Sequence, residues 1–199
     1  YAQAYNNMGI ALQDEGELAA AIDSYKKAIK IKPDYAQAYS NMGVALQDKG
    51  ALVAAIVSYK KAIKIKPNYA DAYCNLGITL NDNGDREAAI DSYKKALKIN
   101  PVHAETYNNM GVTLKDKGEL DAAMESYKQA IQIKPDYAEA YYNMGVIFKK
   151  KSELDAAVRS YKKALLIKPD YEIARASKLH QQAHICDWTA IQEDSEYIS

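Results

Sequence analysis

Every proline and every glycine in this chain of 199 residues falls on a spacing of 34 residues. The prolines fill one position of the period, and the glycines fill two others: Pro33, Pro67, Pro101, Pro135 and Pro169; Gly9, Gly43, Gly77, Gly111 and Gly145; Gly16, Gly50, Gly84 and Gly118. Gly and Pro punctuate secondary structure, so this fixed period predicts an array of repeated units rather than one compact core. The repeats are 2–35, 36–69, 70–103, 104–137 and 138–171.

Each repeat is expected to hold two amphipathic helices. In the first repeat, apolar or small residues recur at helical spacing in two series: Ala4, Tyr5, Met8, Gly9 and Leu12, then Leu18, Ala21, Ile22, Tyr25, Ala28 and Ile29. Gly16 separates the two series, where a helix end favours a residue that tolerates positive φ. Pro33 ends the second helix. Asp34 is then predicted to cap the next helix, with Gln37 completing a capping-box pair.

Composition narrows the class of protein. The chain carries 26 basic and 26 acidic residues, so it lacks the basic excess of a nucleic-acid binder. Its longest apolar run, 51–57, is far shorter than the roughly 20 residues of a membrane-spanning helix. Cys74 and Cys186 cannot form a disulfide framework, which favours a reducing, cytoplasmic location. We therefore expect neither a nucleic-acid partner nor a membrane partner.

The repeat resembles the tetratricopeptide repeat, a helix–turn–helix unit of 34 residues. The resemblance covers residues 2–171. It rests on positions occupied alike in every repeat: Tyr5, Tyr39, Tyr73, Tyr107 and Tyr141; Met8, Met42, Leu76, Met110 and Met144; Ala21, Ala55, Ala89, Ala123 and Ala157; Tyr25, Tyr59, Tyr93, Tyr127 and Tyr161. Two places depart from it, Ser152 instead of glycine and Val102–His103 after Pro101. The resemblance implies an all-α, right-handed superhelical solenoid whose first helices line a concave groove.

One polar position of the first helix is asparagine in all five repeats. Stacked amides offer donors and acceptors to the backbone of an extended peptide, although asparagine is also simply common at this place in such repeats. Polar residues precede the asparagines by four positions, and an apolar stripe follows them by three. The candidate peptide-binding residues are Asn7, Asn41, Asn75, Asn109, Asn143, Gln37, Asp71, Glu105, Val44, Ile78 and Val112.

The charges around these asparagines bear on the ligand. Chaperone adaptors of this family grip a terminal carboxylate with basic residues at the asparagine and four-earlier positions, and this chain has none there. The groove is therefore expected to take internal peptide segments that are neutral or basic. Lysines recur instead on the second helices, where we interpret them as a solvated face whose stems cover apolar surface. The lysines are Lys26, Lys27, Lys60, Lys61, Lys94, Lys95, Lys128, Lys162 and Lys163.

The two ends differ from the repeats. Tyr1 fills the slot of Tyr35, which suggests a piece of a longer array, and the uncapped first repeat is expected to permit end-to-end self-association. Residues 172–199 are predicted to form a capping helix and a tail that leads to a missing downstream region. That helix is expected to turn Ile173, Ala176, Leu179 and Ala183 toward the last repeat. Solenoids need such a cap for solubility.

No catalytic constellation, metal site or cofactor site is predicted. His180, His184 and Cys186 lack a fourth ligand at zinc spacing, and no glycine is left for a phosphate loop. The segment Cys186–Asp187–Trp188 resembles the one that follows the repeats in O-linked N-acetylglucosamine transferases. A protein-interaction module is thus the main hypothesis. The alternatives are the substrate-recognition arm of such a glycosyltransferase, without its catalytic domain, and a self-assembling scaffold.

Overall fold

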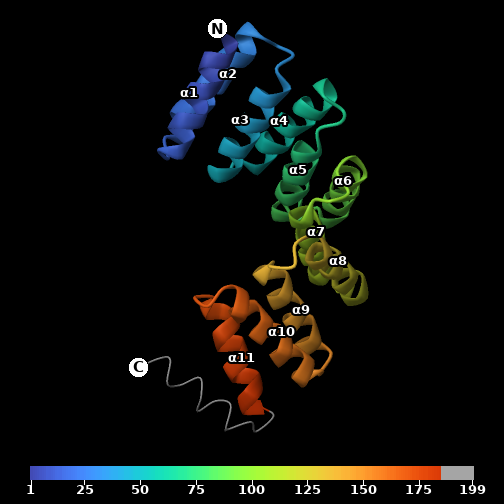
Figure 1. Cartoon of the computed structure of the whole chain (residues 1–199). Helices are drawn as coiled ribbons and strands as arrows, with labels where there is room; N and C mark the ends of the chain where they lie inside the picture. Colours follow the sequence, from blue (N-terminus) through green and yellow to red (C-terminus); the bar gives the residue numbers. More distant parts are fainter. Residues whose placement is uncertain (185–199) are drawn as a thin grey trace. The chain divides into compact units, whose positions relative to one another are not determined.

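The computed structural model describes residues 1–184, and all regular secondary structure within them is α-helical. Five helix pairs and one further helix follow one another, as labelled in Figure 1. Their bounds are α1 (Ala2–Asp14), α2 (Leu18–Ile31), α3 (Ala36–Asp48), α4 (Leu52–Ile65), α5 (Ala70–Asp82), α6 (Arg86–Ile99), α7 (Ala104–Lys117), α8 (Leu120–Ile133), α9 (Ala138–Lys150), α10 (Leu154–Ile167) and α11 (Glu172–His184). Among these described helices, none is long and apolar enough to span a membrane.

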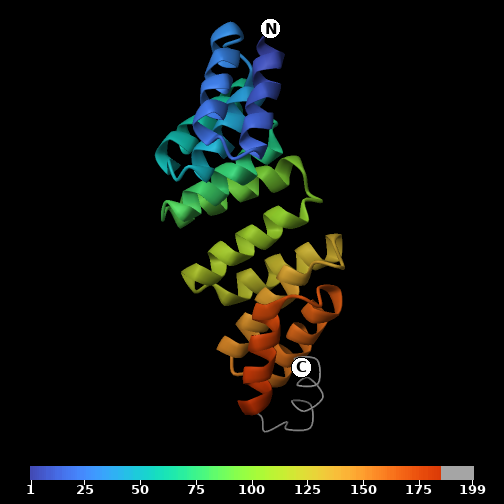
Figure 2. The same ribbon diagram turned by 90° about the vertical axis from the view of Figure 1, so that its left-hand side faces the viewer.

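The chain divides into an N-terminal unit, Tyr1–Val102, and a C-terminal unit, His103–Ser199. In the N-terminal unit each helix packs against the next, from α1 to α6, and α3 also contacts the first helices α1 and α5. The C-terminal unit repeats this order from α7 to α11. Figure 2 shows the helices of each unit stacked in succession. The expected helical solenoid is confirmed in this stacking.

The two helices of a repeat meet where a glycine faces a tyrosine. The tyrosines Tyr25, Tyr59, Tyr93, Tyr127 and Tyr161 are fully buried. A Cβ atom on Gly43 would lie 2.6 Å from Cε1 of Tyr59, closer than two carbon atoms can approach. The same clash recurs in every repeat. The glycine is therefore required for close packing of the helix pair rather than for backbone flexibility.

The turn inside each repeat requires a left-handed residue. Gly118 has φ +87°, and Ser152 adopts φ +61° at the same place in the fifth repeat. The serine thus keeps the turn and bears the steric cost that glycine avoids. Lys151, beside it, forms an ion pair with Asp121 of α8. This contact holds the pKa of Asp121 below its usual value.

The prediction that Asp34 caps α3 is wrong. Tyr35 occupies the N-cap position, and no side-chain hydrogen bond caps this helix. Asp34 lies one residue too early, while the Tyr35 ring lies under Lys32 Nζ at 5.2 Å from its centroid. The capping-box pair with Gln37 is therefore absent at this helix start. His103 is different, because its ring accepts a hydrogen bond from Thr106 N and caps α7.

The face that α11 turns toward α10 also differs from the prediction. Ile173, Ala176 and Ala183 are exposed and Leu179 is half-buried, whereas Ala174, Lys178, Gln181 and Gln182 are buried. These four occupy the repeat positions of Ala38, Met42, Ala45 and Leu46. The helix therefore keeps the register of a first helix although its sequence no longer supplies apolar residues there. Cys186, Asp187 and Trp188 lie outside the described residues.

Candidate functional site

One face of the first helices carries the same three kinds of side chain in successive repeats. On α3 these are Asn41, Val44 and Asp48, at helical spacing i, i+3 and i+7, so they lie on one side of the helix. The neighbouring first helices supply the equivalent sets Asn7, Ile10 and Asp14 on α1, and Asn75, Ile78 and Asp82 on α5. We call this surface of α1, α3 and α5 the first-helix face. It runs from an amide row through an apolar row to a carboxylate row.

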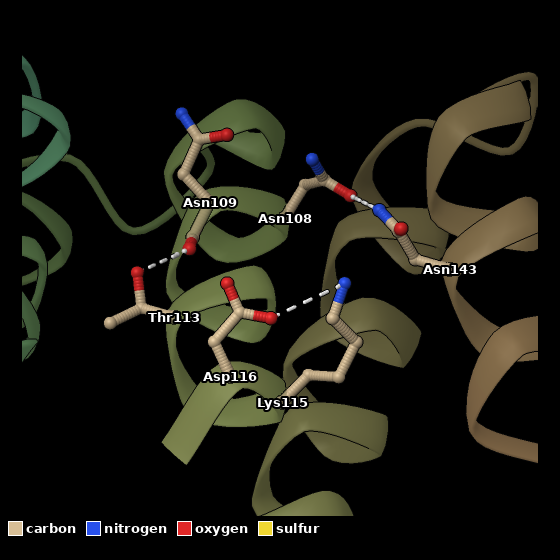
Figure 3. A network of polar contacts seen from close by, with 6 residues as sticks. All are labelled: Asn108, Asn109, Thr113, Lys115, Asp116 and Asn143. Carbon is tan, nitrogen blue, oxygen red and sulfur yellow. Dashed lines mark hydrogen bonds and ion pairs between the residues drawn. The ribbon is translucent and has the colours of Figure 1, made fainter. Parts of the chain in front are cut away.

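The predicted asparagines do not form one uninterrupted ladder. Asn41 Nδ2 donates a hydrogen bond to Asn6 Oδ1 at 3.0 Å. In the C-terminal unit Asn143 Nδ2 donates to Asn108 Oδ1 at 3.2 Å, as Figure 3 shows. The acceptor in each pair is the residue just before an asparagine of the predicted set, one repeat earlier. These bonds orient Asn41 and Asn143 and leave each a free oxygen and a second N–H.

The other asparagines keep their amides available. Within the described residues, no hydrogen bond engages the side chains of Asn7, Asn75 or Asn109. Ser40 stands before Asn41 where Asn6 stands before Asn7, and its short, buried side chain does not reach Asn75. Figure 3 shows the Asn109 side chain directed away from the Asn108–Asn143 pair. The residue that precedes an asparagine of this row thus determines whether the asparagine of the next repeat is hydrogen-bonded.

The flanking candidates lie where the helical spacing predicts. Gln37, Asp71 and Glu105 are exposed in the first turns of α3, α5 and α7. The apolar residues Val44, Ile78 and Val112 are half-buried, so each offers part of its surface to a ligand. Gln37 and Asp71 belong to the same unit as Asn41 and Asn75. Glu105, Asn109 and Val112 repeat the arrangement on α7.

A polar row at the other end of this face was not predicted from the sequence. Gln13 Nε2 donates to Asp48 Oδ2 at 2.9 Å, and Gln47 Nε2 lies 3.4 Å from Asp82 Oδ2. The periodic recurrence of glutamine followed by aspartate near the end of the first helices was the signal for it. Exposed carboxylates at Asp14, Asp48 and Asp82 therefore form an acidic edge beside the apolar row.

Each glutamine also joins this edge to a buried tyrosine. Tyr25 donates its hydroxyl proton to Gln13 Oε1 at 3.1 Å, and Tyr59 donates to Gln47 Oε1 at 3.3 Å. Thr79 Oγ1 adds a bond of 2.7 Å to the same Gln47 oxygen. Burial, and then the charge of Asp14, raise the pKa of Tyr25 to about 12. The tyrosines therefore remain neutral donors that fix the glutamines.

The C-terminal unit departs from this arrangement. Lys115 replaces the glutamine and pairs with Asp116 at 3.6 Å (Figure 3). The buried hydroxyl of Tyr127 then has no hydrogen-bond partner among the described residues. On α9, Lys150 takes the place of the aspartate. The acidic edge thus belongs chiefly to the N-terminal unit.

The lysines of the second helices partly cover aromatic rings. The ammonium groups of Lys27, Lys95 and Lys163 lie 5.7–6.0 Å from the ring centroids of Tyr5, Tyr73 and Tyr141. Such cation–π contacts hold the lysine stems against the surface. This agrees with the interpretation of the basic stripe as a solvated face. Among the described residues, no cluster of three metal-ligating side chains occurs.

These features define a helical repeat protein that carries the same polar and apolar rows in successive repeats. Models of the tetratricopeptide repeat match in overlapping segments: TPR repeat over residues 11–50, 48–84 and 113–152, and tetratricopeptide repeat over residues 70–103, 138–171 and 92–125. The chain belongs to the tetratricopeptide repeat family.

Solved structures agree with this assignment. MamA is 33% identical over 81% of this chain and 94% of its own, with a TM-score of 0.75. YrrB, described as a TPR protein with an unusual peptide-binding site, is 27% identical over 89% of this chain and 92% of its own, with a TM-score of 0.71. PilF of Pseudomonas aeruginosa shares the fold at 18% identity over 96% of this chain and 87% of its own, with a TM-score of 0.85. Curated proteins gave no significant sequence match.

Proposed function

We propose that the first-helix face of the N-terminal unit binds an extended peptide segment that carries basic side chains. The observation that carries the proposal is the alignment of amide, apolar and carboxylate rows on three neighbouring helices. An extended backbone presents alternating donors and acceptors, which Asn side chains match. Asn41 is already oriented by Asn6, so it loses less side-chain freedom on binding than an unheld amide.

The acidic edge supports the preference for basic segments. Asp48 and Asp82 are exposed. The carboxylate of each accepts a hydrogen bond from the side-chain amide of the glutamine in the preceding repeat. Carboxylates held in this way attract lysine or arginine side chains of a peptide lying across Val44 and Ile78. The description of YrrB as peptide-binding adds support from a relative.

The test is binding of a library of unstructured peptides to Asn41→Ala/Asn75→Ala, with Asn68→Ala in an exposed loop as the matched control. We expect the double variant to bind selected peptides about tenfold more weakly, which is about 1.4 kcal/mol, with unchanged helicity. If the double variant kept its affinity for these peptides, the amide row would not be part of the binding site.

A second pair of substitutions tests the charge preference. Asp48→Asn/Asp82→Asn keeps an oxygen acceptor for each glutamine and removes both charges. We expect weaker binding of lysine-rich peptides and a flatter dependence of affinity on salt, because the electrostatic contribution is lost. Equal binding of basic and acidic peptides by the unaltered protein would contradict the preference.

Self-association through α1 is a second candidate. Met8 is 52% exposed, whereas Leu76 at the same repeat position is 5% exposed. An apolar face of this kind favours contact with another molecule. Light scattering across a concentration series should show association that Met8→Lys abolishes; a mass independent of concentration would exclude it.

Two expectations from the sequence stay predictions. The glycosyltransferase arm rests on the resemblance at Cys186–Asp187–Trp188, outside the described residues. The cytoplasmic location rests on cysteine usage. The proposed peptide binding by the first-helix face depends neither on a glycosyltransferase domain nor on a cytoplasmic location.

A further inference from the structure

The second repeat differs from the others on the outward stripe of its second helix. In α2 this stripe reads Ala19, Asp23, Lys26 and Lys30, and in α6 it reads Glu87, Asp91, Lys94 and Lys98. The first half of each stripe thus contains at least one acidic residue, and the second half holds two lysines. In α2 the two halves meet, with Lys26 Nζ 3.5 Å from Asp23 Oδ1. One of the two lysine charges of this stripe is therefore paired within α2.

In α4 the stripe has valines at the two acidic positions of α6 and keeps both lysines. The equivalent stripe is Val53, Val57, Lys60 and Lys64, and Ala51 stands where Glu17, Asp85, Glu119 and Glu153 begin the other second helices. The repeat 36–69 carries five lysines against one acid, Asp48, whereas repeat 2–35 carries four lysines against five acids. The lysines of α4 therefore have no acidic residue one turn before them on their own helix.

The replaced positions open onto a groove. Val53 is 68% exposed and Val57 is 54% exposed, one turn apart on α4. They line a cavity of about 600 Å³, together with Met42 and Leu46 of α3 and with Ile22 and Lys26 of α2. This volume falls in the range of about 300–1,000 Å³ that is typical of binding sites. All three helices belong to the N-terminal unit.

We propose that this groove binds an amphipathic helix of a partner protein. Along one face of that helix, apolar side chains are followed by carboxylate side chains. The apolar side chains lie over Val53 and Val57 in the groove, and the carboxylates lie over Lys60 and Lys64. Charge complementarity selects this occupant, because the three lysines of α4, Lys60, Lys61 and Lys64, have no acidic residue on their own helix. The α3 residues in the groove, Met42 and Leu46, do not belong to the first-helix face, so the site is independent of the proposed peptide binding.

The geometry gives the orientation of the partner. The apolar half of the stripe is the N-terminal half of α4 and the basic half is the C-terminal half. On the α2 side the groove is lined by Lys26, whose charge is already paired with Asp23. The acidic residues of the docked helix therefore gather toward the C-terminal end of α4. This is the helix-in-groove mode of recognition, extended by a charged anchor.

The experiment is selection from a displayed library of amphipathic helical peptides of about four turns, with glutamate, glutamine or lysine allowed at the flanking positions. We expect the selected peptides to be enriched in glutamate next to the apolar stripe. Val53→Glu/Val57→Asp restores the residues that α6 carries and should weaken their binding at least about tenfold, while circular dichroism shows unchanged helicity. Asn41→Ala/Asn75→Ala is the control and should leave binding unchanged.

Several outcomes would overturn the proposal. Selection that yields no peptides, or peptides enriched in lysine, contradicts the charge argument. Equal binding to Val53→Glu/Val57→Asp places the contact elsewhere. Binding to phosphatidylserine vesicles without peptide binding, lost in the double variant, would assign the surface to a membrane. Concentration-dependent dimers that the double variant abolishes would assign it to a second copy of the chain.

Discussion

A single hydroxyl group shows how the environment of one residue differs between repeats. Tyr59 and Tyr127 occupy the same repeat position and are equally buried. Tyr59 donates to Gln47, whereas Lys115 replaces the glutamine in the repeat of Tyr127, whose hydroxyl has no hydrogen-bond partner among the described residues. A buried polar group without a partner is costly, while one with a partner contributes modestly to stability.

This difference predicts opposite results for the same substitution. Tyr59→Phe should lower the free energy of unfolding by about 1 kcal/mol, because Gln47 loses a donor. Tyr127→Phe should leave it unchanged or raise it, because an unsatisfied hydroxyl disappears. Urea denaturation of the two variants, followed by circular dichroism, measures both changes. Equal losses would show that the Tyr59–Gln47 bond contributes nothing specific.

Features that depend on local sequence could be predicted, whereas contacts between side chains of different repeats could not. The five helix pairs were predictable because apolar periodicity and glycine position are local properties of the chain. The engagement of Asn41 was not, because it depends on Asn6 in the preceding repeat. Gln13 and Gln47 were overlooked for the same reason: their role appears only when Tyr25 or Tyr59 and the next repeat's aspartate are brought beside them.

At the scale of an element, the turn between α9 and α10 carries strain. Ser152 holds the left-handed conformation that Gly118 adopts in the repeat before. Ser152→Gly should raise the free energy of unfolding by roughly 1 kcal/mol, since a side chain in this conformation costs about that amount. The matched substitution Gly118→Ser should lower it by a similar amount. Thermal melts of both variants provide the comparison, and a loss in both would contradict the argument.

Helix α11 is the element whose packing was predicted least well. Its apolar residues suggested one face, but the surface left by α10 accepts the face that a first helix would present. Gln181 and Gln182 are buried there with unsatisfied amide atoms. Replacing Gln182 by leucine, the residue of Leu46, Leu80 and Leu114 at the same position, should stabilise α11. Hydrogen exchange of residues 172–184 would detect the slower opening, and unchanged exchange would argue against this register.

At the scale of the whole molecule, four of the buried tyrosines make folding sensitive to alkali. Burial, with contributions from neighbouring groups, raises the pKa of Tyr25 and of Tyr161 to about 12, and it raises the pKa of Tyr59 and Tyr127 as well. The unfolded chain ionises its tyrosines near pH 10. The stabilising contribution is therefore complete below about pH 10 and is lost as the pH rises through about 12.

We expect the melting temperature to fall between about pH 10 and about pH 12 together with the appearance of tyrosinate absorbance. Tyr25→Phe, which removes one ionisable hydroxyl, should reduce the slope of this fall. Lysines also lose charge in this range, so the difference between the variant and the unaltered protein is the diagnostic quantity. An identical slope would assign the sensitivity to the lysines.

The hydrogen bonds between neighbouring repeats have a consequence for how such a chain can be rearranged. Asn6 pairs with Asn41, Gln13 with Asp48 and Gln47 with Asp82, so each residue reaches one position beyond its own equivalent. The side chains of one repeat therefore determine which polar side chains of the next repeat are hydrogen-bonded. Transposing two repeats would keep every residue of the protein and still change which asparagines are held and which are free. The order of the repeats, and not their composition alone, therefore determines which of these side chains are hydrogen-bonded.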